Sequence, residues 1–502
     1  MTSSRGESSV NRTTSCRRTG RCSVARVYCL LALLMVSEMR PQSLTAQTVK
    51  PPPAESLRSY RFPAVDQFTL PNGVRVLLVR KTTLPIVTAS ILVDAGTQYE
   101  TEAEAGLANL TASLLRDGTV NITGKHIAER LAALGAHTEP VISKRYGGAT
   151  VTALKAVFPD AWRLAAATIS SPAFRDSDVT HARAVLVAAL ERRRTDPLGS
   201  AFDMLTRILY QPGSPDARPT EGLAASAASL DADDVRRWYA DLYGPRRTTV
   251  LVVGDVGTAE VRQLLQSTLG AWRQHPRGRI ALRSTARRSA RARIVLLDRA
   301  GAEQTALVLG RVMPPASDSG YLPLLLVNRL LGSGVSSRLN ANLRERHGYT
   351  YGIRSYYDAR PGTAVFSIEG NVRTNVTDSA VVETLREYTR LTRDSIGVAE
   401  LETAAASLAG SFPNSVQTVQ GLRLRLANLL AWGMPLDYFA TYRERLMGVG
   451  PDEARRIAAA RFDLSDLTLV LLGDLSRIER PVRALNLGDV EVRDPEGNLI
   501  RR

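Results

Sequence analysis

The chain contains Asp233-Asp-Val-Arg-Arg-Trp-Tyr-Ala240 and then Thr248-Thr-Val-Leu-Val-Val-Gly-Asp255. Both segments return 219 residues later, as Asp452-Glu-Ala-Arg-Arg-Ile-Ala-Ala459 and Leu467-Thr-Leu-Val-Leu-Leu-Gly-Asp474. Each copy has a charged segment typical of a surface helix and an apolar run typical of a buried strand. Similarity at a long period indicates two copies of one structural unit. We therefore predict an α/β fold, an α+β sandwich with two homologous domains. Each domain is expected to be a mixed, mainly antiparallel sheet covered on one face by helices.

Length and composition agree with this organisation. At 502 residues the chain exceeds one comfortable hydrophobic core. The segment 273–293 carries eight Arg and no acidic residue, which favours a solvated basic linker over a specific anion site. We predict a signal peptide at 1–46, an extended leader at 47–64, a first domain at 65–272, the basic linker at 273–293 and a second domain at 294–485.

The N-terminal segment has the pattern of an export signal. The apolar run Val27–Val36 follows Arg17, Arg18, Arg21 and Arg26, and Leu44-Thr-Ala46 offers a cleavage site. The three cysteines all lie before this site, so the mature chain contains none. We expect an exported, periplasmic protein with no stable membrane anchor after cleavage.

The net charge of +16 is spread along the chain. It favours an arginine-rich solvated surface, with a basic face for acidic peptides or membranes as the alternative. No nucleic-acid motif and no alternation of aromatic and basic residues is present, so we expect no nucleic-acid partner.

Two local patterns open the first domain. Asn72-Gly73 separates two apolar runs within 68–79, which predicts a hairpin with a two-residue type I′ turn. In Ala105-Gly-Leu-Ala-Asn-Leu-Thr-Ala-Ser-Leu-Leu-Arg-Asp-Gly-Thr119, leucines recur at helical spacing, and Gly118 suits the helix C-terminus. The segment 105–119 is therefore expected to be a short amphipathic helix.

Together, the Asn-Gly hairpin, the helix and the Gly-Thr pair resemble the opening of the pitrilysin/insulinase family of zinc metallopeptidases, in its two-domain bacterial type. In active members the helix reads Gly-Leu-Ala-His-x-x-Glu-His, and a third ligand, Glu, follows about 76 residues later. The matching positions here are Asn109, Ala112, Ser113 and Ala189. Glu191 lies two residues out of phase, about 200° around a helix. An amide, a methyl group and a neutral hydroxyl are poor substitutes for imidazole and carboxylate, so we expect no zinc in this chain.

The resemblance extends to the strand that binds substrate in active members. That edge strand pairs with the substrate backbone, and here it carries Glu139-Pro140. Proline lacks the N–H group that strand addition requires. Loss of substrate pairing and simple protection of a sheet edge are equally open interpretations of Pro140.

A second signature of the family is retained in the C-terminal half. The stretch 331–352 resembles its Gly-rich turn, Ser-Arg-Leu, Leu-Arg-Glu and a Tyr seven residues after the Arg, which correspond to Arg344 and Tyr351. In the family these side chains stabilise the substrate carbonyl at the zinc site of a facing domain, as hydrogen-bond donors suited to negative charge. The alternative is a structural role, with Arg344 paired to Glu345 and Tyr351 packed in a strand.

The resemblance implies a non-zinc subunit of a heterodimeric metallopeptidase that hydrolyses peptides. This chain alone would be inactive. Arg344 and Tyr351 would serve the zinc site of a homologous, zinc-bearing partner subunit. The alternative is an inert pseudopeptidase that acts as a scaffold or binds peptides.

Overall fold

The computed structural model describes residues 60–289, 291–394 and 396–502. The signal peptide at 1–46 and most of the leader at 47–64 therefore lie outside the described residues. The last leader residues are described, and Tyr60 and Phe62 pack against the ring of Phe412.

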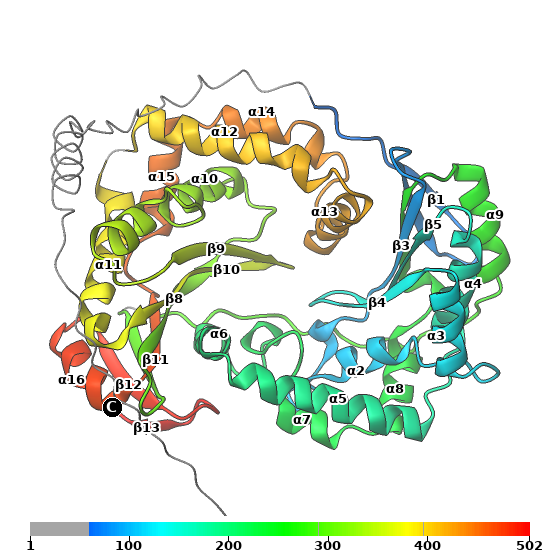
Figure 1. Ribbon diagram of the computed structural model, residues 1–502, viewed down its shortest axis with the longest axis horizontal. Coiled ribbons are helices and arrows are strands. Elements are labelled where there is room, and N and C mark those ends of the chain that lie inside the picture. Colours follow the sequence, from blue (N-terminus) through cyan, green and yellow to red (C-terminus); the bar gives the residue numbers. More distant parts are fainter. Residues whose placement is uncertain (1–59, 290, 395) are drawn as a thin grey trace, which may run out of the picture. The chain divides into compact units, whose positions relative to one another are not determined.

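Two sheets form within the described residues (Figure 1). The first has the strand order β1-β2-β6-β3-β5-β4, and the second has the order β13-β12-β7-β11-β8-β10-β9. The strands of the first sheet are β1 (Asp66–Thr69), β2 (Arg75–Arg80), β3 (Ile86–Val93), β4 (His137–Ile142), β5 (Gly147–Leu154) and β6 (Thr248–Gly254). Those of the second are β7 (Arg293–Asp298), β8 (Gln304–Met313), β9 (Ile353–Arg360), β10 (Thr363–Arg373), β11 (Thr468–Gly473), β12 (Asp489–Arg493) and β13 (Leu499–Arg501).

The helices alternate with these strands in the same order in both halves. In the first half they are α2 (Leu107–Leu114), α3 (Gly124–Ala133), α4 (Phe158–Ser170), α5 (Asp176–Arg194), α6 (Pro197–Leu209), α7 (Ala224–Ser229), α8 (Ala232–Leu242) and α9 (Thr258–Leu269). In the second half they are α10 (Tyr321–Leu331), the π-helix η4 (Asn340–Arg346), α11 (Thr377–Arg393), α12 (Val398–Ser415), α13 (Val419–Trp432), α14 (Tyr442–Met447), α15 (Pro451–Arg461) and α16 (Leu475–Ala484).

The sheet topology confirms the repeat. β6 pairs parallel with β2 and antiparallel with β3, and β11 pairs parallel with β7 and antiparallel with β8. The two repeated sequence runs thus form the same interior strand of each sheet. Both sheets are mixed, as predicted, because each interior strand arrives through a helical connection and inserts between two consecutive strands, parallel to one and antiparallel to the other.

The Asn72-Gly73 hairpin is present, but its turn differs from the prediction. β1 and β2 pair antiparallel, with Thr69 opposite Arg75. Only Gly73 has a positive φ, at 99°, whereas a type I′ turn requires positive φ at Asn72 as well. Pro71 explains the difference, because its fixed φ suits the second position of a type I turn. The Asn72 amide instead donates to the carbonyls of Leu269 and Trp272.

Each sheet also receives one helix from the other half on its second face. Leu77 and Val79 of β2 pack with Leu422 and Leu426 of α13, and Figure 1 shows α13 on the side opposite α4 and α9. Correspondingly, α6 of the first half packs on the second sheet, where the side chain of Leu205 lies against Gly310 of β8. The helices α6 and α13 occupy equivalent places in the repeat, so the exchange is reciprocal.

The ends of the second half add two further features. β12 and β13 follow residue 485, where the sequence placed the end of the second domain, and both join the second sheet. The linker is less solvated than expected, because Arg279 bonds both Asp241 and Glu104 and lies over the ring of Trp238.

None of the helices in the described residues has the length and apolar character to cross a membrane.

Candidate functional site

The short helix α2 forms within the predicted segment 105–119, with its leucines buried against the first sheet. It ends at Leu114 and not at Gly118 as predicted, because Gly118 pairs with Thr123 in an isolated bridge instead. It begins after Gly106, whose φ is 114°. The carboxylate of Glu100 caps this end, accepting hydrogen bonds from the N–H groups of Gly106 at 3.2 Å and Ala108 at 2.8 Å. A buried carboxylate at a helix N-terminus is stabilised by these free N–H groups and by the helix dipole.

The family-equivalent positions on α2 are occupied by groups that already have other contacts. The amide of Asn109 donates to the carbonyl of Glu221 at 2.9 Å, and the hydroxyl of Ser113 donates to the carbonyl of Leu110 at 2.8 Å. Ala112 is buried and has no ligand atom. The first hydrogen bond links α2 to the segment at Glu221, and the second lies within the helix. They do not bring several acceptor atoms together at one point.

The fourth position, Ala189, lies on α5, which packs against α2. The structure thus brings together the helices that carry all four positions. Glu191 is exposed and forms an ion pair with Arg194 at 3.7 Å. It therefore does not replace the missing carboxylate.

The residues present do not fit a zinc ion. Zinc requires about four nitrogen, sulfur or carboxylate ligands, and the four equivalent side chains offer none of them. Over residues 60–289, 291–394 and 396–502, no three His, Cys, Asp or Glu residues gather in a group that could hold a metal ion.

β4 is an edge strand of the first sheet, and it contains Glu139 and Pro140. Ala112 and these two residues line a void of about 20 Å³ between α2 and β4. A void of this size holds about one water molecule. The side chains of α2 and β4 therefore pack together with little space between them.

Arg344 lies in the π-helix η4, which is held in place by hydrogen bonds of two buried asparagines. The buried amide of Asn342 donates to Glu383 and Glu387 of α11 at 2.8 and 2.7 Å. The oxygen of Asn340 accepts from the N–H group of Ile353 at the start of β9. Single turns of π-helix are rare and often occur at functional sites. The Arg344 side chain is half-exposed and pairs with Glu345 at 3.3 Å, as the structural interpretation expects.

Tyr351 is 93% exposed and precedes β9. It is therefore not packed in a strand, contrary to the structural alternative. Its segment is held by Thr350, whose hydroxyl group contacts the carbonyls of Gly352 and Asn371 at 2.9 and 2.7 Å. The result is a fixed backbone that presents a phenol to solvent.

A buried ionic network beside α2 was not predicted from the sequence. Arg218 donates to the carbonyl of Glu100, and Lys144 donates to the carbonyls of Pro215 and Arg218, each at 2.8 Å. Asp216 pairs with Arg360 of the second half at 3.3 Å. Burial raises the pKa of Glu100 to about 7 and lowers the pKa of Lys144 to about 8. Widely separated single charges give no spacing signal, so sequence patterns could not have revealed this network.

Comparison with known proteins places these features in a family. A model described as "Insulinase (Peptidase family M16)" matches residues 75–219, and one described as "Peptidase M16 inactive domain" matches residues 229–408. An uncharacterized zinc protease of Streptomyces coelicolor is 24% identical over 402 residues, covering 78% of this chain and 86% of that protein.

Solved structures share the fold. A peptidase M16 inactive domain from Pseudomonas fluorescens has a TM-score of 0.75 and 22% identity, covering 82% of this chain and 98% of the other. A chain of Complex III2 from Candida albicans has a TM-score of 0.71 and 16% identity, covering 84% and 99%. At such identities the likeness concerns the fold alone.

Proposed function

Since this chain belongs to the insulinase family of peptidases, family M16, but lacks the family's zinc motif, we propose that it is the non-zinc subunit of an exported heterodimeric peptidase. Its partner would be a homologous subunit that carries zinc, and the substrate would be a peptide. The chain by itself would not hydrolyse peptides.

The exposed Tyr351 on a fixed backbone carries this proposal. A surface tyrosine could lie on a loose loop at no cost, yet its segment is tied down by Thr350, and the preceding η4 is anchored by Asn342. Arg344 is on the same η4 and remains half-exposed despite its pair with Glu345. Such an exposed ion pair is weak and can be exchanged for a substrate contact.

Arg344 and Tyr351 would act as donors to the substrate carbonyl while it gains negative charge. The metal chemistry would belong to the partner subunit, since nothing at Asn109, Ala112 or Ser113 can bind zinc. A preorganised donor of this kind is worth about a hundredfold or more in rate.

The test mixes the purified chain with an M16 homologue from the same organism that has an intact zinc motif, and follows hydrolysis of a fluorogenic peptide. We expect activity only in the mixture. Tyr351→Phe and Arg344→Ala should each lower kcat about a hundredfold, with assembly unchanged by size-exclusion chromatography. Tyr356→Phe on β9 and Arg346→Ala on η4 are matched controls and should retain activity.

A partner that is fully active alone and gains nothing from this chain would contradict the proposal. The second candidate, an inert scaffold or peptide-binding pseudopeptidase, is favoured by the loss of the zinc motif and by Pro140 on the edge strand β4. It predicts that a complex forms and that Tyr351→Phe and Arg344→Ala leave its activity unchanged.

A further inference from the structure

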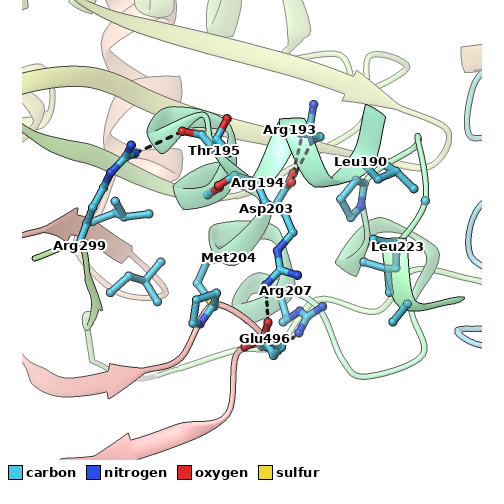
Figure 2. Close-up of a pocket in the computed structure, with 18 of the residues that line it drawn as sticks. Leu190, Arg193, Arg194, Thr195, Asp203, Met204, Arg207, Leu223, Arg299 and Glu496 are labelled. Atoms are coloured by element: carbon cyan, nitrogen blue, oxygen red, sulfur yellow. Dashed lines mark hydrogen bonds and ion pairs between the residues drawn. The ribbon is translucent and has the colours of Figure 1, made fainter. Parts of the chain in front are cut away.

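A pocket of about 460 Å³ lies away from the α2 positions, where α5, α6 and α7 meet the second sheet and the turn between β12 and β13 (Figure 2). This volume is typical of small-ligand sites. Its apolar lining comes from both halves and includes Met204, Leu223, Leu297 and Leu472. Four arginines also line it. The pocket therefore combines an apolar body with a cationic rim.

Two of the four arginines are already paired with carboxylates. Arg193 bonds Asp203 through two contacts, at 3.1 and 2.9 Å, and Arg194 pairs with Glu496. These ion pairs link α5 to α6 and to the turn between β12 and β13. They hold the pocket together and leave little free donor capacity.

Among the described residues, the guanidinium groups of the other two arginines hydrogen-bond only to backbone carbonyls. Arg207 donates to the carbonyl of Glu496, and Arg299 donates to the carbonyl of Thr195 at 3.3 Å. Within the described residues neither forms an ion pair. A guanidinium with a neutral partner keeps its full charge and its preference for a carboxylate.

The turn that carries Glu496 is built to approach Arg207. Asp494 closes it by accepting from the N–H and side-chain amide of Asn498, at 2.7 and 2.8 Å. Gly497 has a φ of 89°, and a Cβ there would lie 2.8 Å from Cδ of Arg207. Figure 2 shows Glu496 beside Arg207 at this turn. The turn thus adds the Glu496 carboxylate to a rim that also contains Asp203 and Asp298.

We propose that this pocket binds a carboxylate attached to an apolar group, with Arg207 or Arg299 holding the anion and Glu496 acting as an internal competitor. The lining leucines and Met204 would take the apolar group. The C-terminus of a peptide ending in an apolar residue and a medium-chain fatty carboxylate share this chemistry. Tyr351 is not among the residues that line this site.

Isothermal titration of the purified chain tests the site with three probes, namely N-acetyl-Ala-Leu as free acid, the same dipeptide as its amide, and octanoate. We expect at least one of the two carboxylates to bind, and the amide to bind at least about tenfold more weakly than the acid. Binding by the dipeptide alone assigns the site to peptide C-termini, and binding by octanoate alone assigns it to fatty carboxylates.

Variants sharpen the test. Arg299→Ala or Arg207→Ala, whichever removes the arginine that holds the anion, should weaken binding about tenfold, whereas Arg192→Ala, an exposed neighbour on α5 outside the pocket, should not. Glu496→Gln should tighten binding severalfold, because it removes the internal carboxylate. Arg299 is exposed, so its variant is expected to fold even if Arg207→Ala does not. The proposal is overturned if Glu496→Gln binds neither carboxylate at millimolar concentration, or if Arg299→Ala and Arg207→Ala both bind as tightly as the unmodified chain.

Discussion

The buried carboxyl of Glu100, beside α2, makes the free energy of unfolding depend on pH. Its side chain is 1% exposed, and burial raises its pKa to about 7, against the opposing effects of the Ala108 and Gly106 N–H groups and of the Arg218 and Lys144 charges. The same carboxyl titrates near 4.5 in an unfolded chain. Between these values the folded chain keeps a proton that the unfolded chain has lost. The free energy of unfolding must therefore fall as pH rises from about 4.5 to 7, by about 2–3 kcal/mol from this group.

Glu100→Gln should flatten this pH dependence. The glutamine oxygen can still accept from Gly106 and Ala108, but it does not ionise. Urea unfolding of both proteins at pH 5, 6 and 7 measures the difference, in which the other titrating groups cancel. The comparison is kept below pH 8 because of Lys144, whose pKa burial lowers to about 8. Above that pH, Lys144 makes the free energy of unfolding rise with pH, which opposes the effect of Glu100. Equal slopes for the two proteins would show that Glu100 ionises normally.

Several residues at the site could be interpreted from the sequence alone. Asn109, Ala112 and Ser113 offer neither imidazole nor carboxylate whatever their surroundings, and the pair of Arg344 with Glu345 needs only adjacency. The exposure of Tyr351 could not be predicted, because an isolated tyrosine beside a strand is as often buried. The partners of Glu100 are brought to it by the fold from distant positions, so no local pattern reports them.

For the helices α6 and α13, too, the sequence predicts one property and leaves another to be shown by the fold. Their apolar faces predict burial, yet amphipathicity does not say against which sheet a helix packs. On α13, Gln420 donates to the hydroxyl of Thr152 and Arg423 donates to that of Ser90, at 2.7 and 2.9 Å. These bonds pair a helix of the second half with strands of the first and fix its position.

Leu426 of α13 should therefore stabilise the first half. It is fully buried against the first sheet, whereas Leu424 on the same helix is 53% exposed. Leu426→Ala should lower the free energy of unfolding by about 2–5 kcal/mol, and Leu424→Ala by less than about 0.5 kcal/mol.

Making both leucine substitutions in a Trp432→Phe variant lets tryptophan fluorescence report on the first half specifically. The three remaining tryptophans, at 162, 238 and 272, all lie in the first half. Their fluorescence during urea unfolding then reports the first half alone. A Leu426→Ala transition that coincides with that of Leu424→Ala would contradict the packing of α13 on the first sheet.

For the whole chain, the reciprocal exchange makes each half incomplete without the other. Residues of α6 bury Val295 and Val308 of the second sheet, and residues of α13 bury Leu77 and Val253 of the first. The pair of Asp216 with Arg360 adds a buried charge contact, which is strongly destabilising when one partner is removed. Cohesion of the halves thus depends on these contacts and not on the single linker that joins them.

Cleavage of the linker should leave the two halves associated. Ile280 is 89% exposed, so a protease site inserted after it should be accessible without disturbing the core. After cleavage we expect one species of unchanged size by size-exclusion chromatography in native buffer, and two fragments in denaturant. Fragments that separate without denaturant would contradict the exchange of α6 and α13. Each fragment expressed alone should aggregate, because it exposes the apolar face of one sheet and the apolar side of one helix.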